Sequence, residues 1–172
     1  MFQVNIDDYL IGYFFLGSGK NNQCFYNDHS VVKVFFDLDV ANKEATQMIA
    51  ANKVNSLAVR FHSLETIDDV HFLFMEKIKA LTQQEIDLFS ISDRKVMANL
   101  AADQLLELHE QFIYHMDIKT PSATFDNILI SSDGIRLIDW GRSCEYTSGE
   151  SKEAYGKDWN SWCDFTKYFY NL

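Results

Sequence analysis

The sequence contains little proline, glycine or cysteine. Its 172 residues include one proline and seven glycines, and no Gly/Ser-rich or Gln-rich tract interrupts them. We therefore expect neither a linker nor a low-complexity arm, and 47% hydrophobic residues are enough for one buried core. The three cysteines, Cys24, Cys144 and Cys163, are widely spaced and form no Cys-x-x-Cys pair. This argues against a disulfide framework or a structural zinc site and favours a cytosol-like compartment.

Basic residues are also scarce. Fifteen Lys and Arg against twenty-five Asp and Glu give a formal charge of −10, which would repel the phosphate backbone of a nucleic acid. The first residues lack a positively charged n-region, and Asp7 and Asp8 break their apolar run, so we expect no signal peptide. No stretch is long and apolar enough to predict a membrane span. Nucleic acid and the membrane interior are therefore not expected partners.

The first half of the chain has the pattern of a sheet with one helix. Aromatic and β-branched runs separated by turn-prone residues predict three strands between residues 10 and 36. Asp39 can cap a helix over residues 40–53. Two further strand-like runs follow at 57–64 and 70–78.

The second half is more helical. From Ser92 to Phe112, apolar residues recur every three or four positions, which predicts a long amphipathic helix. Two short strands are expected at 125–131 and 135–140 around the turn SSDG. The aromatic residues of the last segment have helical spacing and are expected in the core: Trp162, Phe165, Tyr168, Phe169 and Tyr170. The order of elements predicts the α+β class.

A pair of glycines lies in the first turn, as Gly17-Ser18-Gly19 between two strand-like runs. This context excludes a Rossmann or P-loop motif, which would place the glycines before a helix. Because glycine has no Cβ and tolerates positive φ, such a turn can let its backbone approach phosphate oxygens. An ordinary hairpin turn is the alternative.

Lys33 is the charged residue within the apolar run Val31–Phe36. A lysine in such a strand needs either water or a partner for its amine. Glu44, on the following helix, offers the opposite charge. The alternatives are an outward-facing lysine and a solvated glutamate.

Three polar positions in the second half suggest chemistry. Asp117 follows the long helix, Asn127 precedes a strand, and Asp139 ends the hairpin. A carboxylate at a helix exit can orient a hydroxyl and accept its proton, while an Asn oxygen and a second carboxylate suit Mg²⁺. Each residue alone could equally cap a turn.

Taken together, these segments resemble eukaryotic-type protein kinases. LHEQFIYHMDIK, DNILI and DGIRLIDWG are similar to the catalytic loop, the strands after it and the D-F-G segment. LGSG and VVKVF resemble the glycine-rich loop and the strand with the ATP-binding lysine. The resemblance covers about residues 10 to 165. It implies a bilobal kinase-like fold in a single domain, 1–172, with a β-rich N-lobe over about 1–78, a hinge near 75–79 and a reduced, truncated helical C-lobe over about 80–172.

The resemblance implies an ATP- and Mg²⁺-dependent phosphotransferase. Lys33 would bind the α- and β-phosphates, Asp117 would receive the proton of the acceptor hydroxyl, and Lys119 would steady the γ-phosphate. Asn127 and Asp139 would hold Mg²⁺. The other implied nucleotide-binding residues belong to the glycine loop, the partner of the lysine, the gatekeeper position and the hinge: Gly17, Ser18, Gly19, Glu44, Met75, Glu76 and Ile78.

The sequence departs from the kinase pattern in three places. Met116 replaces the arginine that would bind an activation-loop phosphate, so we expect activity without such phosphorylation. Asp117 and Asn127 are ten positions apart where the family has five, so Thr120–Phe125 must loop out. No Ala-Pro-Glu motif follows Gly141, and the late helices of the large lobe are not expected. Minimal kinases that bacterial pathogens deliver into host cells, such as OspG, are similarly short.

The resemblance therefore implies a Ser/Thr protein kinase of the secreted effector type, or a viral equivalent. Its expected location is the cytosol, including a host cytosol reached by a non-classical route. A host protein is the expected substrate, and a partner that also activates the enzyme is compatible with the short large lobe. Two alternatives stay open: a small-molecule kinase acting on an antibiotic or sugar, and a pseudokinase that only binds a partner.

Overall fold

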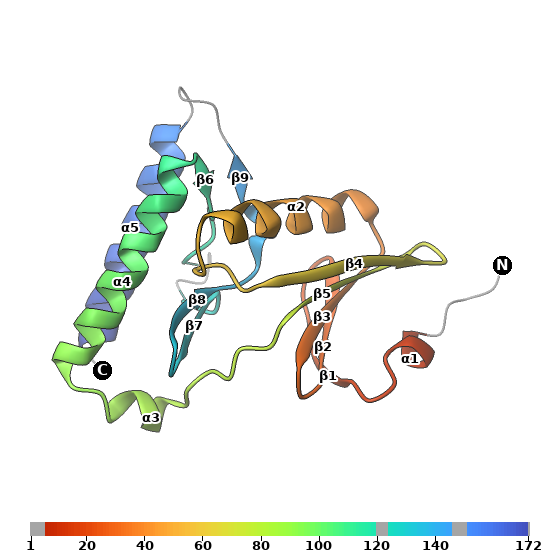
Figure 1. The fold of residues 1–172 in the computed structure, drawn as a ribbon, viewed down its shortest axis with the longest axis horizontal. Helices are drawn as coiled ribbons and strands as arrows, with labels where there is room; N and C mark the ends of the chain where they lie inside the picture. The colour runs from red at the N-terminus through yellow and green to blue at the C-terminus, as the bar shows by residue number, and fades with distance from the viewer. Residues whose placement is uncertain (1–5, 120–123, 146–150, 172) are drawn as a thin grey trace.

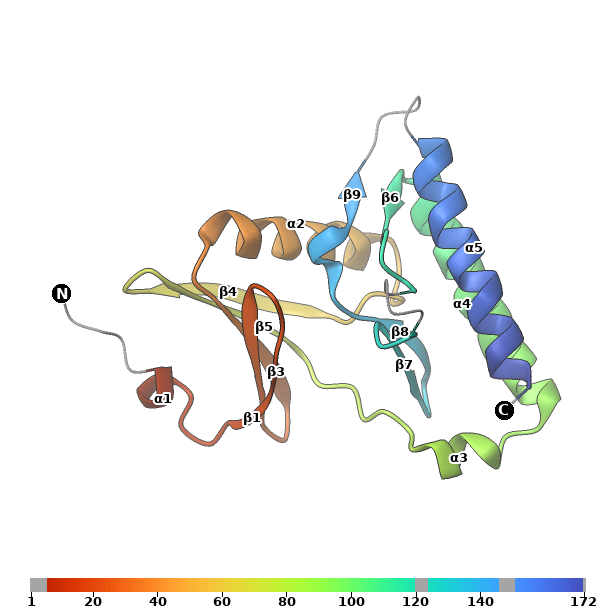
Figure 2. The same cartoon turned by 180° about the vertical axis from the view of Figure 1, so that it is seen from behind.

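A five-stranded antiparallel sheet forms the first part of the computed structural model, which describes residues 6–119, 124–145 and 151–171. The strand order is β1-β2-β3-β5-β4, and a short helix, α1 (Ile6–Tyr9), precedes it. The strands are β1 (Phe14–Ser18), β2 (Asn22–Tyr26), β3 (Ser30–Phe35), β4 (Phe61–Ile67) and β5 (Val70–Glu76). Figures 1 and 2 show this sheet beside a mainly helical part of the molecule.

The alternation in β3 gives the sheet two faces. Val32 and Val34 pack into a small cluster on one face with Leu10, Val70 and Phe72. The side chain of Lys33 belongs to the opposite face, because successive residues of a strand point to opposite sides. Lys33 therefore lies on the face that α2 covers, where Glu44 of that helix pairs with it.

Helix α2 (Leu38–Val54) begins at a different cap from the one predicted. Asp37, not Asp39, is the N-cap: its carboxylate accepts hydrogen bonds from the N–H groups of Asp39 and Val40 at 2.9 and 3.2 Å. The backbone of Asp37 is extended, so its side chain can reach the N–H groups two and three residues on. Asp39 lies in the first turn, where a negative charge suits the helix dipole.

The helical part consists of α3 (Gln83–Asp87), α4 (Ile91–Glu110) and α5 (Ser151–Tyr170). Helices α4 and α5 lie side by side in both views (Figures 1 and 2). Helix α4 is the long helix predicted from Ser92, but it ends before Phe112, which has a φ of 58° and an exposed ring. The chain leaves the helix at this left-handed residue and continues into β6.

The aromatic residues of α5 were all expected in the core, and only some of them are buried there. Trp162, Phe165 and Phe169 are buried, whereas Tyr168 is 49% exposed. Helix α5 begins at Ser151.

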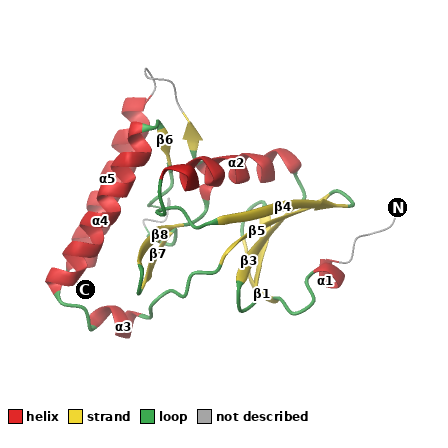
Figure 3. Cartoon of the chain, in the orientation of Figure 1, coloured by secondary structure: helices red, strands yellow, loops and turns green. Residues whose placement is uncertain are grey.

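Short strands connect the long helices (Figure 3). The predicted hairpin is present, with narrower bounds than expected, and Gly134 takes a φ of 122° at its turn. The remaining elements are β6 (Ile113–Tyr114), β7 (Ile128–Ser131), β8 (Gly134–Leu137), the 3-10 helix η1 (Trp140–Arg142) and β9 (Cys144–Glu145).

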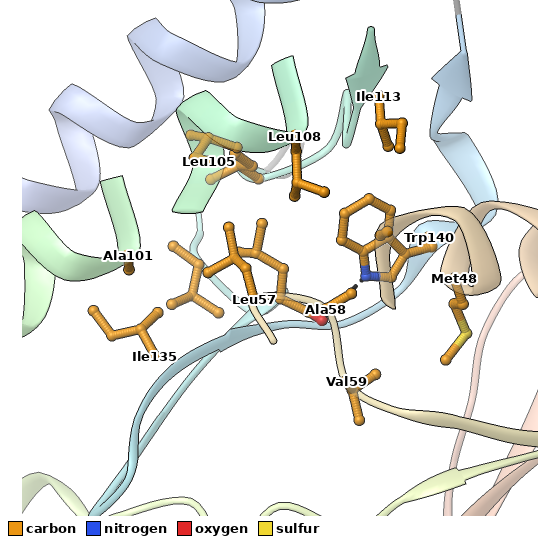
Figure 4. Close-up of a cluster of buried hydrophobic side chains, with 14 of the residues drawn as sticks. Met48, Leu57, Ala58, Val59, Ala101, Leu105, Leu108, Ile113, Ile135 and Trp140 are labelled. Carbon is orange, nitrogen blue, oxygen red and sulfur yellow. Dashed lines mark hydrogen bonds between the residues drawn. The ribbon is translucent and has the colours of Figure 1, made fainter. Parts of the chain in front are cut away.

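One hydrophobic core joins the two parts of the molecule. Figure 4 shows Met48 of α2, Leu105 of α4 and the buried Trp140 in the same cluster. Residues 57–59, predicted as the start of a strand, bridge to β8 instead: Leu137 donates its N–H to Leu57 O at 2.7 Å and accepts from Val59 N–H at 3.1 Å. Among the described residues, no helix is long and apolar enough to cross a membrane. The predicted α+β class is confirmed.

Candidate active site

A cleft of about 460 Å³ lies between the glycine turn and the segments that follow α4. Its polar lining comes from five separate parts of the chain: the glycine turn, β3, α2, the loop after β6 and the turn after β8. The residues that line it include most of the predicted site: Gly17, Ser18, Gly19, Lys33, Glu44, Asp117, Asn127 and Asp139. The fold therefore gathers residues that lie up to 122 positions apart, from Gly17 to Asp139.

Lys33 forms two ion pairs at the floor of this cleft. Its Nζ lies 2.5 Å from Glu44 Oε1 and 2.9 Å from Asp139 Oδ1. Lys33 and Glu44 are almost completely buried, whereas the side chain of Asp139 is 48% exposed. The lysine of β3 thus ties a helix of the first half to the turn after β8.

The charges of this cluster depend on one another. Burial lowers the pKa of Lys33, but the carboxylates of Glu44 and Asp139 outweigh burial and raise it. Burial raises the pKa of Asp139, yet the Lys33 ammonium more than offsets this and lowers it. Burial also raises the pKa of Glu44, against the Lys33 ammonium. Because two carboxylates face the ammonium group, the pKa of Lys33 is raised and the proton stays on the lysine.

Local backbone features bring Glu44 and Asp139 together. Asp139 has a φ of 62°, a left-handed conformation that is rare for residues other than glycine. A Cβ on Gly141 would lie 3.3 Å from Glu44 Oε2, so a glycine lets the turn approach α2. The D-W-G sequence is thus used for its backbone as well as for its carboxylate.

Asp117 and Asn127 meet despite the ten positions between them. The Asn127 amide donates from Nδ2 to Asp117 O at 2.7 Å and to Asp117 Oδ2 at 3.4 Å. Both residues are buried to more than 90% and line the cleft. The chain therefore returns to the site after the predicted Thr120–Phe125 loop, of which residues 120–123 lie outside the described residues.

Two ion pairs hold the charged groups around this loop. Arg142 Nη1 lies 3.2 Å from Asp117 Oδ1, and its side chain is 59% exposed. Lys119 Nζ lies 2.7 Å from Asp164 Oδ2 on α5. Lys119 does not line the cleft, so the structure does not bring this predicted residue together with the others. The lysine lies beside the site rather than in it.

Asp158 was missed by the analysis of the sequence. Its fully buried carboxylate accepts the backbone N–H groups of His115 and Met116, both at 2.7 Å, and lies 3.3 Å from His109 Nε2. Met116 has a φ of 66°, so these bonds hold a strained turn directly before Asp117. A signal was available: Asp158 occupies a core position in the buried stripe of α5. The stripe consists of Ala154, Asp158, Trp162, Phe165 and Phe169.

His115 is the second support of the loop. Its Nε2 donates to Ile138 O at 2.9 Å, and its Nδ1 accepts the Asp117 N–H at 3.3 Å. Both contacts suit a neutral imidazole with the proton on Nε2. Burial lowers the pKa of His115, which favours the same neutral form.

The glycine turn uses its glycines differently from the prediction. Neither Gly17 nor Gly19 has a positive φ. A Cβ on Gly19 would lie 3.0 Å from Asn22 Oδ1, whereas one on Gly17 would meet no atom within 4 Å. A side chain at Gly19 would therefore have to displace the Asn22 amide, whereas Gly17 leaves open space beside the backbone.

The predicted gatekeeper and hinge residues lie outside the lining of the cleft. Met75 pairs with Val31 in the sheet and is buried in the main core, on the face that carries Lys33. The Glu76 N–H donates to Arg60 O at 2.9 Å, and Ile78 O accepts from Ala80 N–H at 3.0 Å. These backbone groups are thus used within the protein, and the structure does not gather Met75, Glu76 and Ile78 with the polar cluster.

The chemistry of Asn127 and Asp139 fits Mg²⁺. Because the Asn127 nitrogen donates to Asp117, its carbonyl oxygen is the atom left for a cation. Together with the carboxylate of Asp139 it gives hard oxygen ligands. The described part of the chain has no cluster of three or more His, Cys, Asp or Glu placed to bind a metal. Two protein ligands suit Mg²⁺, which usually shares its coordination with substrate phosphates and water.

The sequence matches no protein-family model and no curated protein. The fold, however, is protein-kinase-like. The structure of the Cydia pomonella granulovirus kinase PK-1 is similar to this chain, with a TM-score of 0.66 at 16% sequence identity. The match covers 96% of this chain and 70% of the viral chain. The expected β-rich lobe followed by a helical part is thereby confirmed.

Proposed function

We propose that the chain is an ATP- and Mg²⁺-dependent phosphotransferase that phosphorylates serine or threonine residues of a protein. One observation carries the proposal: Lys33, Asp117, Asn127 and Asp139 come together in one cleft, in the order and chemical roles that phosphoryl transfer needs. A fold alone would not support an activity.

The mechanism follows from the charges of the cleft. Lys33, fixed by Glu44 and Asp139, offers a permanent positive charge to the α- and β-phosphates. Asn127 and Asp139 would hold Mg²⁺, which when bound supplies charge neutralisation for the phosphates. Asp117 would accept the proton of the acceptor hydroxyl as the acceptor oxygen binds phosphorus and ADP leaves. Most of the catalysis would come from positioning and electrostatics.

A protein is proposed as the phosphate acceptor because Lys119 lies two positions after Asp117, a spacing that resembles Ser/Thr kinases. The open mouth of the cleft, with Arg142 exposed, is compatible with a large acceptor. The same proposal includes a host protein that serves as substrate and also activates the enzyme.

The test is transfer of labelled phosphate from ATP with Mg²⁺ to proteins of a eukaryotic lysate. Asp139→Ala is expected to lower labelling by roughly 10²-fold or more, because it removes a metal ligand and a partner of Lys33. Asp103→Ala, the same change at an exposed position of α4, is the control and should label as the wild type does. Equal labelling by Asp139→Ala and the wild type would contradict the proposal, and label on a sugar or antibiotic alone would contradict the protein acceptor.

A further inference from the structure

Arg142 stands beside the proton-accepting carboxylate but has no role in the proposed mechanism. It is the last residue of η1, three positions after Asp139, and its side chain is 59% exposed. Its Nη1 lies 3.2 Å from Asp117 Oδ1, and both residues line the cleft. This contact uses one of the five N–H donors of a guanidinium, whose planar fork fits phosphate oxygens. Arg142 can therefore bind an oxyanion in the cleft.

Asp117 is engaged before any acceptor arrives. Its Oδ1 faces Arg142 at 3.2 Å, and its Oδ2 faces the Asn127 amide at 3.4 Å. To accept a proton, the carboxylate has to turn one oxygen toward the acceptor hydroxyl. The pair with Arg142 is the contact that can give way, because an ion pair with one largely exposed partner is weak.

The other cations near the site are placed differently. Lys33 is held between Glu44 and Asp139, and Lys119 is held by Asp164 outside the cleft lining. Lys20, on the glycine turn, lines the cleft from the side of the sheet. Arg142 is thus the cation in direct contact with Asp117. Because the acceptor oxygen must touch both Asp117 and the terminal phosphorus, the phosphoryl oxygens come within reach of the same guanidinium.

We propose that Arg142 is a further catalytic residue, which binds the terminal phosphoryl oxygens of the nucleotide and in doing so releases the Asp117 carboxylate. The inference rests on the proposed phosphotransfer. The acceptor oxygen then forms a bond to phosphorus while the bond to the β–γ bridging oxygen breaks. ADP leaves with that electron pair, and the acceptor proton passes to Asp117. Arg142 keeps its proton throughout and stabilises the charge on the transferring group.

The test compares the affinities of the protein for Mg-ATP and Mg-ADP at equilibrium. Arg142→Gln is expected to lower the affinity for Mg-ATP about tenfold, as for the loss of a charge-assisted bond to phosphate, and to change that for Mg-ADP less than twofold. Arg142→Lys keeps the charge without the fork and should recover part of the difference. Arg60→Gln, the same change at an exposed position before β4, should leave both affinities unchanged.

An indirect effect has to be separated from a direct contact. Removing Arg142 leaves Asp117 unneutralised, and its charge would also repel a γ-phosphate. Asp117→Asn removes that charge and suppresses turnover, so Arg142→Gln is measured again in this background. A direct contact predicts that the tenfold selective loss of ATP affinity remains there. If the loss vanishes in the Asp117→Asn background, Arg142 acts through Asp117 and the inference is wrong.

The remaining outcomes are also decisive. An unchanged ratio of ATP to ADP affinity in Arg142→Gln, with normal transfer by the wild type, overturns the inference and leaves the proposed function intact. A selective loss of ATP affinity in Lys20→Gln but not in Arg142→Gln overturns it in the same way. If the wild type binds neither nucleotide, the proposed function fails, and the inference fails with it.

Discussion

The two ends of the cleft hold their charged groups in opposite ways. At the nucleotide end, the side chains of Lys33 and Glu44 are 9% and 2% exposed and form one buried pair. At the proposed acceptor end, Arg142 is 59% exposed, and beside the cleft lining the side chains of Lys119 and Asp164 are 31% and 45% exposed. A buried pair is costly to break because the remaining charge has no solvent, whereas an exposed pair contributes about 0–1 kcal/mol and exchanges easily. If the proposed function holds, the end that would bind the nucleotide is preorganised, and the end that would meet the acceptor can change partners.

The largest effect is expected from breaking the nucleotide end. Lys33→Met keeps the length of the side chain and removes its charge, which leaves the buried Glu44 without its cation and Asp139 without its ion pair. We expect the transfer rate to fall by roughly 10²-fold or more. The measurement is the rate of phosphate transfer from ATP, together with the circular dichroism of the folded variant.

Lys43→Met is the matched control, since it makes the same change one position before Glu44 on the exposed side of α2. It should keep the wild-type rate. A Lys33→Met protein that is folded and as active as Lys43→Met would show that the buried pair is only structural, and the comparison between the two ends would lose its basis.

The residues that line the cleft around Lys33 and Asp117 could be predicted from the sequence, whereas the ion pairs of Arg142 and Lys119 could not. Strand alternation and the position of α2 predict the pair of Lys33 and Glu44, which are 11 positions apart. Asp139 lies 106 positions from Lys33, and only the fold brings the two together. The pairs of Arg142 and Lys119 depend on where α5 and η1 lie in space, which no local pattern encodes. The hinge expectation at Met75–Ile78 had no support from charge or periodicity, and the structure leaves these residues outside the cleft lining.

The fold was predictable where a pattern continues over many residues. Helix α4 follows from the helical spacing of its apolar residues, and the strands of the sheet follow from aromatic and β-branched runs separated by turns. The N-cap of α2 was not, because Asp37 and Asp39 both precede the apolar stripe and the backbone angle decides between them. Asp158 was missed because an aspartate on a helix usually faces solvent, and only the loop packed against α5 gives it hydrogen-bond donors.

An intermediate effect is expected from Asp158→Asn, which weakens the hydrogen bonds that hold the turn directly before Asp117. The amide can replace one accepting oxygen, but its NH₂ group would face a backbone N–H of the strained turn at Met116. We expect the free energy of unfolding to fall by about 2–3 kcal/mol, the cost of losing a hydrogen bond to a buried charge. Denaturant unfolding followed by fluorescence measures it.

Asp164→Asn is the control on the same helix, because it removes an exposed charge six positions on. Its pair with Lys119 is open to water, so the free energy of unfolding should change by less than about 1 kcal/mol. Similar losses in both variants would mean that Asp158 does not hold the loop more firmly than a surface pair does.

The smallest expected effect is a dependence of the unfolding free energy on pH. It sharpens the comparison because it concerns His115, which accepts the N–H of Asp117. Burial lowers the pKa of His115 below its usual value near 6.5, so the unfolded chain binds this proton more readily than the folded one. The contribution of the neutral imidazole is therefore complete above about pH 6.5 and is lost as the pH falls below it. A proton on Nδ1 would also face the Asp117 N–H, which now donates to that atom. Between pH 7.5 and 5.5 we expect the free energy of unfolding to fall by about 1 kcal/mol.

His115→Gln should lose this dependence of the unfolding free energy on pH, and His29→Gln, at an exposed position, should keep it. An equal slope in His115→Gln and the wild type would assign the titration to another group and remove His115 as the pH-sensitive support of Asp117.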